Sequence, residues 1–149
     1  MSLSNTFFSL LNVGMRPLLR AGVMKANLCI LHYEGRKTGK AYETPLSYVR
    51  DGQRVRLLSS YNTRWWTNFT GESRPVEVEI AGERLPGSAR AITTDSEAFR
   101  TGVREFLTAL PRDASVYGIK LEADRTPRAS DIEACASHVV LIEVALDAA

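Results

Sequence analysis

The spacing of the apolar positions changes near residue 27 and separates a helical segment from a strand-rich one. Before that point, apolar residues recur at helical spacing, which predicts an amphipathic helix over residues 1–22 that begins at Ser4 or Asn5 and ends at Gly22. After it, short apolar or alternating runs predict strands. The predicted strands are Leu28–Tyr33, Thr44–Val49, Val55–Ser59, Val76–Ile80, Arg84–Ile92 and Val139–Val144.

The segments between these strands contain turn and cap signals. Asp51-Gly52 predicts a hairpin, and a short helix is expected over Arg64–Thr70. A longer helix, capped by Asp95, carries Phe99 to Leu110 and ends at Pro111, and Ser130 is expected to cap a small helix through Ala136. The polar stretch Arg112–Ala129 predicts a loop with a short turn.

This pattern favours a compact, β-barrel-like α+β domain that occupies residues 1–149 as a single unit. The alternation of strand and helix is too irregular for a doubly wound sheet. The first strand is also not followed by Gly-x-Gly-x-x-Gly, which argues against a dinucleotide-binding Rossmann fold.

Composition narrows the class of protein further. The 149 residues are 44% hydrophobic and 24% charged, which is typical of a soluble globular domain, and the net charge of +2 is too small to favour a nucleic-acid partner. Cys29 and Cys135 are predicted to be buried free thiols. Two histidines do not make a metal-ligand cluster, so no metal site is expected.

The N-terminal segment is too interrupted to span a membrane. Residues 5–22 contain Arg16, Pro17 and Arg20, and their positive charge follows the apolar stretch, unlike that of a signal peptide. A cytoplasmic location is therefore expected. The helix is expected to pack on its own domain; the alternatives are that residues 5–20 lie on a membrane surface or cover a ligand pocket.

Residues 35–40 read Gly-Arg-Lys-Thr-Gly-Lys between two predicted strands. Arg36, Lys37 and Lys40 place three cations on a glycine-flanked turn, which suits an anion such as a phosphate or a carboxylate. The alternative is a solvated basic hairpin tip. The turn is not a P-loop, because only three residues separate its glycines and Ala41 follows the lysine.

Two further motifs follow this turn in order: Thr44-Pro45-Leu46, and the run Arg64 to Phe69 after Leu58-Ser59-Ser60. Together with Asp51-Gly52 and the Val76–Ile80 strand, the ordered set resembles the deazaflavin-dependent nitroreductase family, the split β-barrel oxidoreductases that use coenzyme F420. The resemblance is close over about residues 25–92. It implies a split β-barrel of the FMN-binding-like type, with an N-terminal helix over 1–22 and the barrel and flanking helices over 25–149.

The resemblance also implies a set of coenzyme-binding residues on the turn, the strand after it and the segment around the double tryptophan. These residues are Arg36, Lys37, Thr38, Lys40, Thr44, Pro45, Leu46, Ser59, Ser60, Trp65 and Asn68. From the residues alone, Trp65 and Trp66 also fit core or lid packing, and Asn68 also fits a helix end. Thr44 and Pro45 also fit an ordinary edge strand, and His32 fits a structural histidine better than a proton donor.

The implied activity is transfer of a hydride from reduced F420 to a quinone, a nitroaromatic or an activated alkene. Tyr48, Tyr61 and Tyr117 are the candidate catalytic hydroxyls. The alternative is a non-catalytic barrel that holds FMN, a tetrapyrrole or a fatty acid. A homodimer is the expected assembly.

Overall fold

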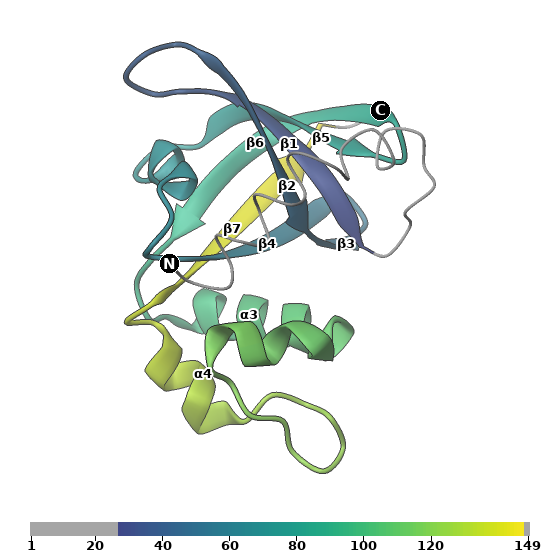
Figure 1. The fold of residues 1–149 in the computed structure, drawn as a ribbon, viewed down its shortest axis with the longest axis vertical. Coiled ribbons are helices and arrows are strands. Elements are labelled where there is room, and N and C mark those ends of the chain that lie inside the picture. Colours follow the sequence, from purple (N-terminus) through teal and green to yellow (C-terminus); the bar gives the residue numbers. More distant parts are fainter. Residues whose placement is uncertain (1–26, 148–149) are drawn as a thin grey trace.

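The computed structural model describes residues 27–147 and shows one curled antiparallel sheet of seven strands with helices against it (Figure 1). The strand order is β2-β1-β5-β6-β7-β4-β3. The strands are β1 (Leu28–Glu34), β2 (Ala41–Ser47), β3 (Val49–Asp51), β4 (Arg54–Ser60), β5 (Arg74–Ile80), β6 (Glu83–Ile92) and β7 (Val139–Leu146). This architecture confirms the predicted α+β split barrel.

Within the part of the chain that the structure describes, four helical segments accompany the sheet. They are the 3-10 helices η2 (Trp65–Phe69) and η3 (Pro111–Tyr117) and the α-helices α3 (Glu97–Ala109) and α4 (Ala129–Cys135). Within residues 27–147, no helix is long and apolar enough to cross a bilayer. The predicted N-terminal helix, and with it the predicted membrane contact of residues 5–20, lies outside the described residues.

Alternation along the strands divides their side chains between two faces. One face closes around an apolar interior to which every strand except β3 contributes, and which η2 completes with Trp65 and Phe69. Leu31, Leu57, Val78 and Ile142 are fully buried there. We call this face the inner face.

A second core forms where α3 and α4 pack against the opposite, outer face of β4 and β7, so that the helices lie on one side of the barrel (Figure 1). The contact between α3 and β7 is close at Gly102, where an added Cβ would come within 2.3 Å of Leu141 Cδ2. Beside it, the buried Arg56 donates from Nε to Glu143 at 3.0 Å and forms an ion pair with Glu105 of α3. Helix and sheet are therefore joined by a buried cation as well as by apolar contact.

Several predicted boundaries are wrong. Helix α3 is capped by Ser96, whose Oγ accepts from Phe99 N at 3.2 Å, while Asp95 instead accepts two bonds from Arg100 at 2.7 and 2.8 Å. Ser130 lies inside α4, which begins after Arg128 without a side-chain cap. The segment predicted as a loop after Arg112 starts with η3.

The expectations for the two cysteines and for His32 are confirmed. Cys29 and Cys135 are free and buried. His32 Nε2 and Glu79 Oε1 are 2.7 Å apart in a mostly buried pair on the outer face of β1, as expected of a structural histidine. Among the described residues, no group of three or more His, Cys, Asp or Glu side chains could hold a metal ion.

The two outermost strands of the described sheet are β2 and the three-residue β3. Pro45 lies in β2 opposite Ile30 of β1. Because proline has no N–H to give to β1, its nitrogen is on the free side of the strand.

Candidate functional site

The cationic turn is the exposed tip of the β1–β2 hairpin. Gly35 N–H donates to Lys40 O at 2.8 Å and Gly39, in the left-handed region with φ 70°, donates to Gly35 O at 2.9 Å. The Thr38 hydroxyl accepts from Lys40 N at 3.3 Å. Thr38 therefore shapes the turn, and the lysine side chains are left to project from it.

Arg36 has a different role from the two lysines. Its backbone N–H donates to Asn68 Oδ1 at 2.8 Å, and its Nη1 donates to Thr70 O and Oγ1 at 3.2 and 3.1 Å. These three bonds attach the turn to the end of η2. Arg36 thus positions the turn against the barrel.

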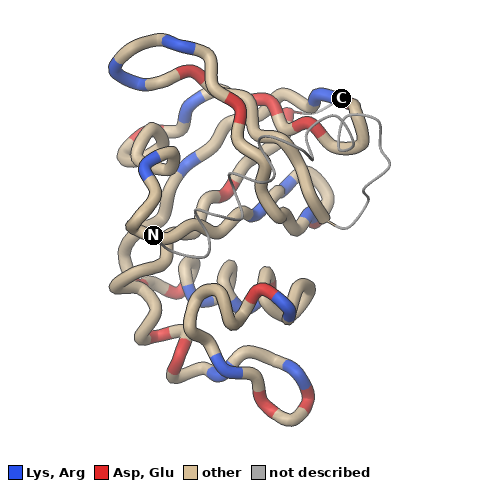
Figure 2. The backbone as a smooth tube through the Cα atoms, viewed as in Figure 1, with Lys and Arg blue, Asp and Glu red and all other residues tan. Residues whose placement is uncertain are grey.

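Lys37 and Lys40 are exposed, and neither side chain has an ion pair or hydrogen bond with the rest of residues 27–147. Figure 2 shows blue Lys and Arg segments at the tip of the β1–β2 hairpin, which extends beyond the body of the barrel. Two uncommitted ammonium groups are thus available to an anion from solvent.

An aromatic cluster lines the inner face next to the turn. Tyr33 stacks on Tyr42 with centroids 5.7 Å apart and meets Phe69 edge-on at 5.4 Å, and Phe69 in turn meets Trp65 at 6.3 Å. Tyr42 is 44% exposed, so one ring of the cluster faces solvent. Gly35 permits this arrangement because an added Cβ would lie 2.9 Å from the Tyr42 ring.

The residues of the Thr-Pro strand divide between the two faces. Leu46 is buried in the inner core, and Thr44, on the same face, shares a 3.3 Å hydrogen bond with the Tyr33 hydroxyl. Pro45 points to the outer face. Thr44 and Leu46 therefore continue the wall that the aromatic cluster begins, whereas Pro45 does not face it.

The end of β4 and η2 form a tightly bonded corner. Ser59 Oγ and Thr63 Oγ1 are 2.7 Å apart, the Ser60 side chain binds Asn62, and Ser60 O accepts from Trp66 Nε1 at 3.2 Å. Asn68 completes the corner, because its Nδ2 donates to Trp65 O at 2.9 Å while its Oδ1 holds Arg36. Asn68 therefore holds the helix end, as one of the two interpretations has it, and it also supports the turn, which the sequence did not predict.

Trp65 is the exception in this corner. It is 9% exposed, and its Nε1 is a buried donor with no hydrogen-bond partner among residues 27–147. An unpaired buried donor is costly, which makes Trp65 a candidate contact for a ligand acceptor.

The three candidate tyrosines lie apart from one another. Tyr48 is half-buried at the end of β2 farthest from the turn, and burial raises the pKa of its hydroxyl. The Tyr61 hydroxyl donates to Thr93 O at 3.1 Å. Tyr117 belongs to the helical core, where its hydroxyl donates to Leu58 O at 3.2 Å and burial raises its pKa strongly.

The sequence-based set omits Tyr33 and Tyr42, although a signal for them was present. Once residues 35–40 are taken as a hairpin turn, antiparallel pairing sets Tyr33 opposite Tyr42, and this is the register observed. Extending the first two predicted strands to the turn would have found the pair.

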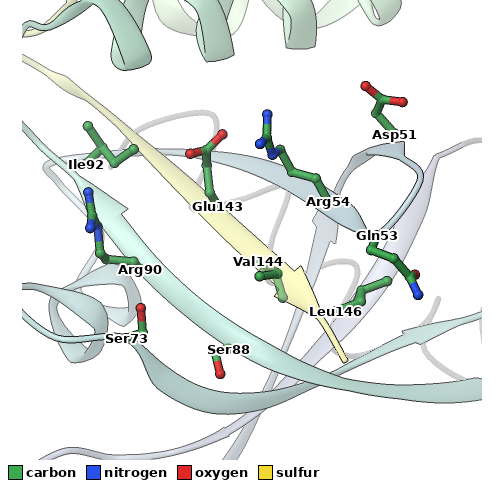
Figure 3. A pocket seen from close by; sticks show the side chains of 11 residues that line it. Asp51, Gln53, Arg54, Ser73, Ser88, Arg90, Ile92, Glu143, Val144 and Leu146 are labelled. Atoms are coloured by element: carbon green, nitrogen blue, oxygen red, sulfur yellow. The ribbon is translucent and has the colours of Figure 1, made fainter. Parts of the chain in front are cut away.

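A hollow of about 660 Å³ lies elsewhere, over the outer face of β4, β7 and β6 (Figure 3). Arg54, Arg90, Asp51 and Glu143 line it, and none of the predicted coenzyme-binding residues does. Its cations are balanced by carboxylates, so it offers less to a polyanion than the turn does. We therefore place the candidate site at the turn and the aromatic cluster rather than in this hollow.

Similar solved structures share the fold at low identity. A structure described as a domain-swapped dimer is 18% identical with a TM-score of 0.56, covering 93% of this chain and 98% of its own. The haem storage protein HutZ of Vibrio cholerae is 11% identical with a TM-score of 0.52, covering 89% of this chain and 90% of its own. The F420-H2-dependent reductase FDR-A is 16% identical with a TM-score of 0.51, covering 80% of this chain and 96% of its own.

No curated protein matches the sequence. The model of the F420H2-dependent quinone reductase family matches residues 19–119, which include the turn, the Thr-Pro strand, the aromatic cluster and η2. The deazaflavin class inferred from the motifs is thereby confirmed, with the quinone reductases as the family that matches. The chain belongs to the F420H2-dependent quinone reductase family.

Proposed function

We propose that this protein is an F420-dependent reductase that passes a hydride from the reduced coenzyme to an electron-poor small molecule, with a quinone as the first substrate to test. The observation that carries the proposal is the pairing of two uncommitted cations, Lys37 and Lys40, with an adjacent aromatic wall. F420 has a phosphodiester and a glutamate tail at one end and a flat ring at the other. The two kinds of surface suit those two ends.

Each residue has a definite part in this proposal. Lys37 and Lys40 bind the anionic end, and Arg36, with Asn68 and Thr70, holds the turn at a fixed position against η2. Tyr33, Tyr42, Thr44 and Leu46 form the wall beside the ring and exclude water from one side of it. Ser59 and Ser60 fix the corner at the end of β4, and Trp65 lies beside them with its indole N–H unpaired among the described residues.

When bound, the coenzyme supplies the hydride from its C5, and the protein supplies orientation and a dry surface. The proton comes from solvent or from a hydroxyl on the inner face. Of the three candidate tyrosines, Tyr48 suits this role best, because it is half-buried on the same face of the same chain segment as Thr44 and Leu46. Tyr61 and Tyr117 donate to backbone carbonyls instead.

We also propose a homodimer and a cytoplasmic location. The first is supported by the similar structure described as a domain-swapped dimer. Light scattering after size-exclusion chromatography tests the homodimer directly, since a molar mass near 16.5 kDa would show that the protein is a monomer.

The decisive experiment is a titration of the purified protein with F420, FMN and a nicotinamide coenzyme, monitored by tryptophan fluorescence. Saturable quenching by F420 at micromolar concentration is expected, followed by quinone-dependent oxidation of the reduced coenzyme. The Trp66→Phe variant should still show the quenching, because the Trp66 indole N–H is bonded to Ser60 O and is not free to contact the coenzyme.

The same titration separates the alternative, a non-catalytic barrel for FMN, a tetrapyrrole or a fatty acid. A protein that purifies with visible colour or with an extractable lipid, and that fails to oxidise reduced F420, would establish a carrier. Absence of saturable binding by F420 would contradict the proposed function.

A further inference from the structure

Arg74 is a charged residue on the inner face of the barrel. It opens β5 directly opposite Ala89 of β6, and opposed residues of an antiparallel pair share a face. Ala89 is fully buried in the inner core, and so are Val76 and Val78, which share the alternation of Arg74 along β5. The Arg74 side chain therefore extends toward the interior rather than toward the helical layer.

Arg74 is half-buried, and one nitrogen of its guanidinium is not satisfied there. Its Nη1 is buried and has no hydrogen-bond partner, and no ion pair joins Arg74 to another described residue. A guanidinium has five N–H donors and no acceptor atom, so only an acceptor from elsewhere can satisfy Nη1. A buried charged donor without an acceptor indicates either strain or a missing partner.

Trp65 presents the second donor of this kind and belongs to the aromatic cluster, and the strand register places Arg74 near that cluster. Trp65 meets Phe69, and Phe69 meets Tyr33. The β1–β5 register, continued beyond its last pair at His32 and Glu77, sets Tyr33 opposite Val76, two residues from Arg74. Trp65 Nε1 and Arg74 Nη1 are the two buried side-chain donors that lack a partner within residues 27–147.

We propose that Arg74 and Trp65 form a buried oxygen-binding subsite in the barrel, where a charged and a neutral N–H donate to a carbonyl or carboxylate oxygen of the bound ligand. This inference rests on the proposed function, which supplies two sources of such an oxygen: the coenzyme and the quinone. Neither donor has an acceptor among residues 27–147, and in this proposal the ligand completes their hydrogen bonding. The subsite differs from the turn, whose lysines are exposed and meet an anion in water.

The test uses Arg74→Met, Arg74→Lys and Trp65→Phe in the full chain, with Arg90→Met as the matched control. Arg90 is an exposed arginine on the neighbouring strand β6, on the outer face. Coenzyme binding is measured by equilibrium dialysis, because Trp65 contributes to the fluorescence signal. Quinone kinetics and thermal melting are measured on the same variants.

If the oxygen belongs to the coenzyme, Arg74→Met raises the Kd for F420 about tenfold or more, Trp65→Phe raises it less, and Arg74→Lys recovers part of the loss. If it belongs to the quinone, the Kd for F420 is unchanged while kcat/KM for the quinone falls by a similar factor. In both cases the melting temperature of Arg74→Met equals or exceeds that of the wild type, because an unpaired buried charge is removed.

The inference is overturned if Arg74→Met lowers the melting temperature while Kd and kcat/KM stay within twofold of the Arg90→Met values, since that is the behaviour of a structural arginine. Failure of the proposed function looks different: the wild type itself would not bind F420. The variants would then be compared by thermal stabilisation with FMN and with the quinone alone. Loss of that stabilisation in Arg74→Met would support the subsite, and equal stabilisation would refute it.

Discussion

The two classes of cation on the turn can be separated by mutation. Lys37→Ala with Lys40→Ala removes both uncommitted ammonium groups, whereas Arg36→Ala removes the two bonds from its guanidinium to Thr70 and leaves the backbone bond to Asn68 in place. The double lysine variant should therefore lose affinity at unchanged stability. Arg36→Ala should lose both affinity and stability.

The magnitude follows from exposure. A charge-assisted contact to a phosphate or carboxylate is strong when it is shielded from solvent, but these two side chains are solvent-exposed. We therefore expect each lysine to contribute about 1 kcal/mol to the binding free energy. Two lysines then give about 2 kcal/mol, or roughly a 30-fold higher Kd for F420. For Arg36→Ala, the two bonds lost to Thr70 are also exposed, and a decrease of about 1 kcal/mol in the free energy of unfolding is expected.

The assay is an F420 titration at several salt concentrations, paired with urea unfolding. Because the Debye length falls from about 10 Å at 0.1 M salt to about 3 Å at 1 M, wild-type affinity should weaken with salt and that of the double lysine variant should weaken much less. A control that removes the same charge elsewhere is Arg104→Ala with Lys120→Ala, two exposed residues outside the barrel. If that control loses as much affinity as the turn variant, or if the turn variant keeps wild-type affinity and salt dependence, Lys37 and Lys40 do not bind the coenzyme.

Three other predictions concern the framework around the site. Gly102→Ala places a methyl group against Leu141 Cδ2 and should lower the free energy of unfolding by about 1–2 kcal/mol, although alanine has the better helix propensity. In a double-mutant cycle, Gly102→Ala combined with Leu141→Ala should cost less than the sum of the two single substitutions. Glu143→Gln weakens the pairing of the buried Arg56 and should lower the free energy of unfolding in urea by about 1–3 kcal/mol. Glu77→Gln, in an exposed pair with Arg84, should change it by no more than about 0.5 kcal/mol. Equal losses in the two variants would contradict the argument that the buried pair matters more. Burial raises the pKa of Tyr117 above its ordinary value near 10, so its contribution to stability is complete below about pH 10 and is lost as pH rises, by up to about 1.4 kcal/mol per pH unit. Tyr117→Phe should cost about 1 kcal/mol at pH 7 and show a shallower loss above pH 10, and parallel pH profiles of the two proteins would rule this out.

The strands and the turn were predictable because their signals are local. Alternation at Val76, Val78 and Ile80 and the glycines at 35 and 39 are readable within a few residues, and the structure has a strand and a hairpin there. The order of strands was not predictable in this way. The β4–β7 pair joins Arg56 to Glu143 across 87 positions, and the local periodicity of a strand does not predict which other strand it pairs with.

Neighbouring residues with the same capability also limit prediction. Asp95 and Ser96 can both cap a helix. Ser96 caps α3, since both carboxylate oxygens of Asp95 accept hydrogen bonds from Arg100 instead. In the turn, Arg36, Lys37 and Lys40 look equivalent in sequence. Only the packing of η2 beside the hairpin shows that Arg36 is engaged and the lysines are not.

Pro45 has a consequence for self-association. A second chain that extends the sheet along β2 must accept hydrogen bonds from the N–H groups on the free side of that strand. The nitrogen of Pro45 carries no hydrogen, so it interrupts this row of donors at mid-strand. The opposite border is β3, whose three residues are too few to template another strand. Copies of this protein should therefore meet through side chains on their faces, or by exchanging a segment, and fibre-like stacking edge to edge should be suppressed.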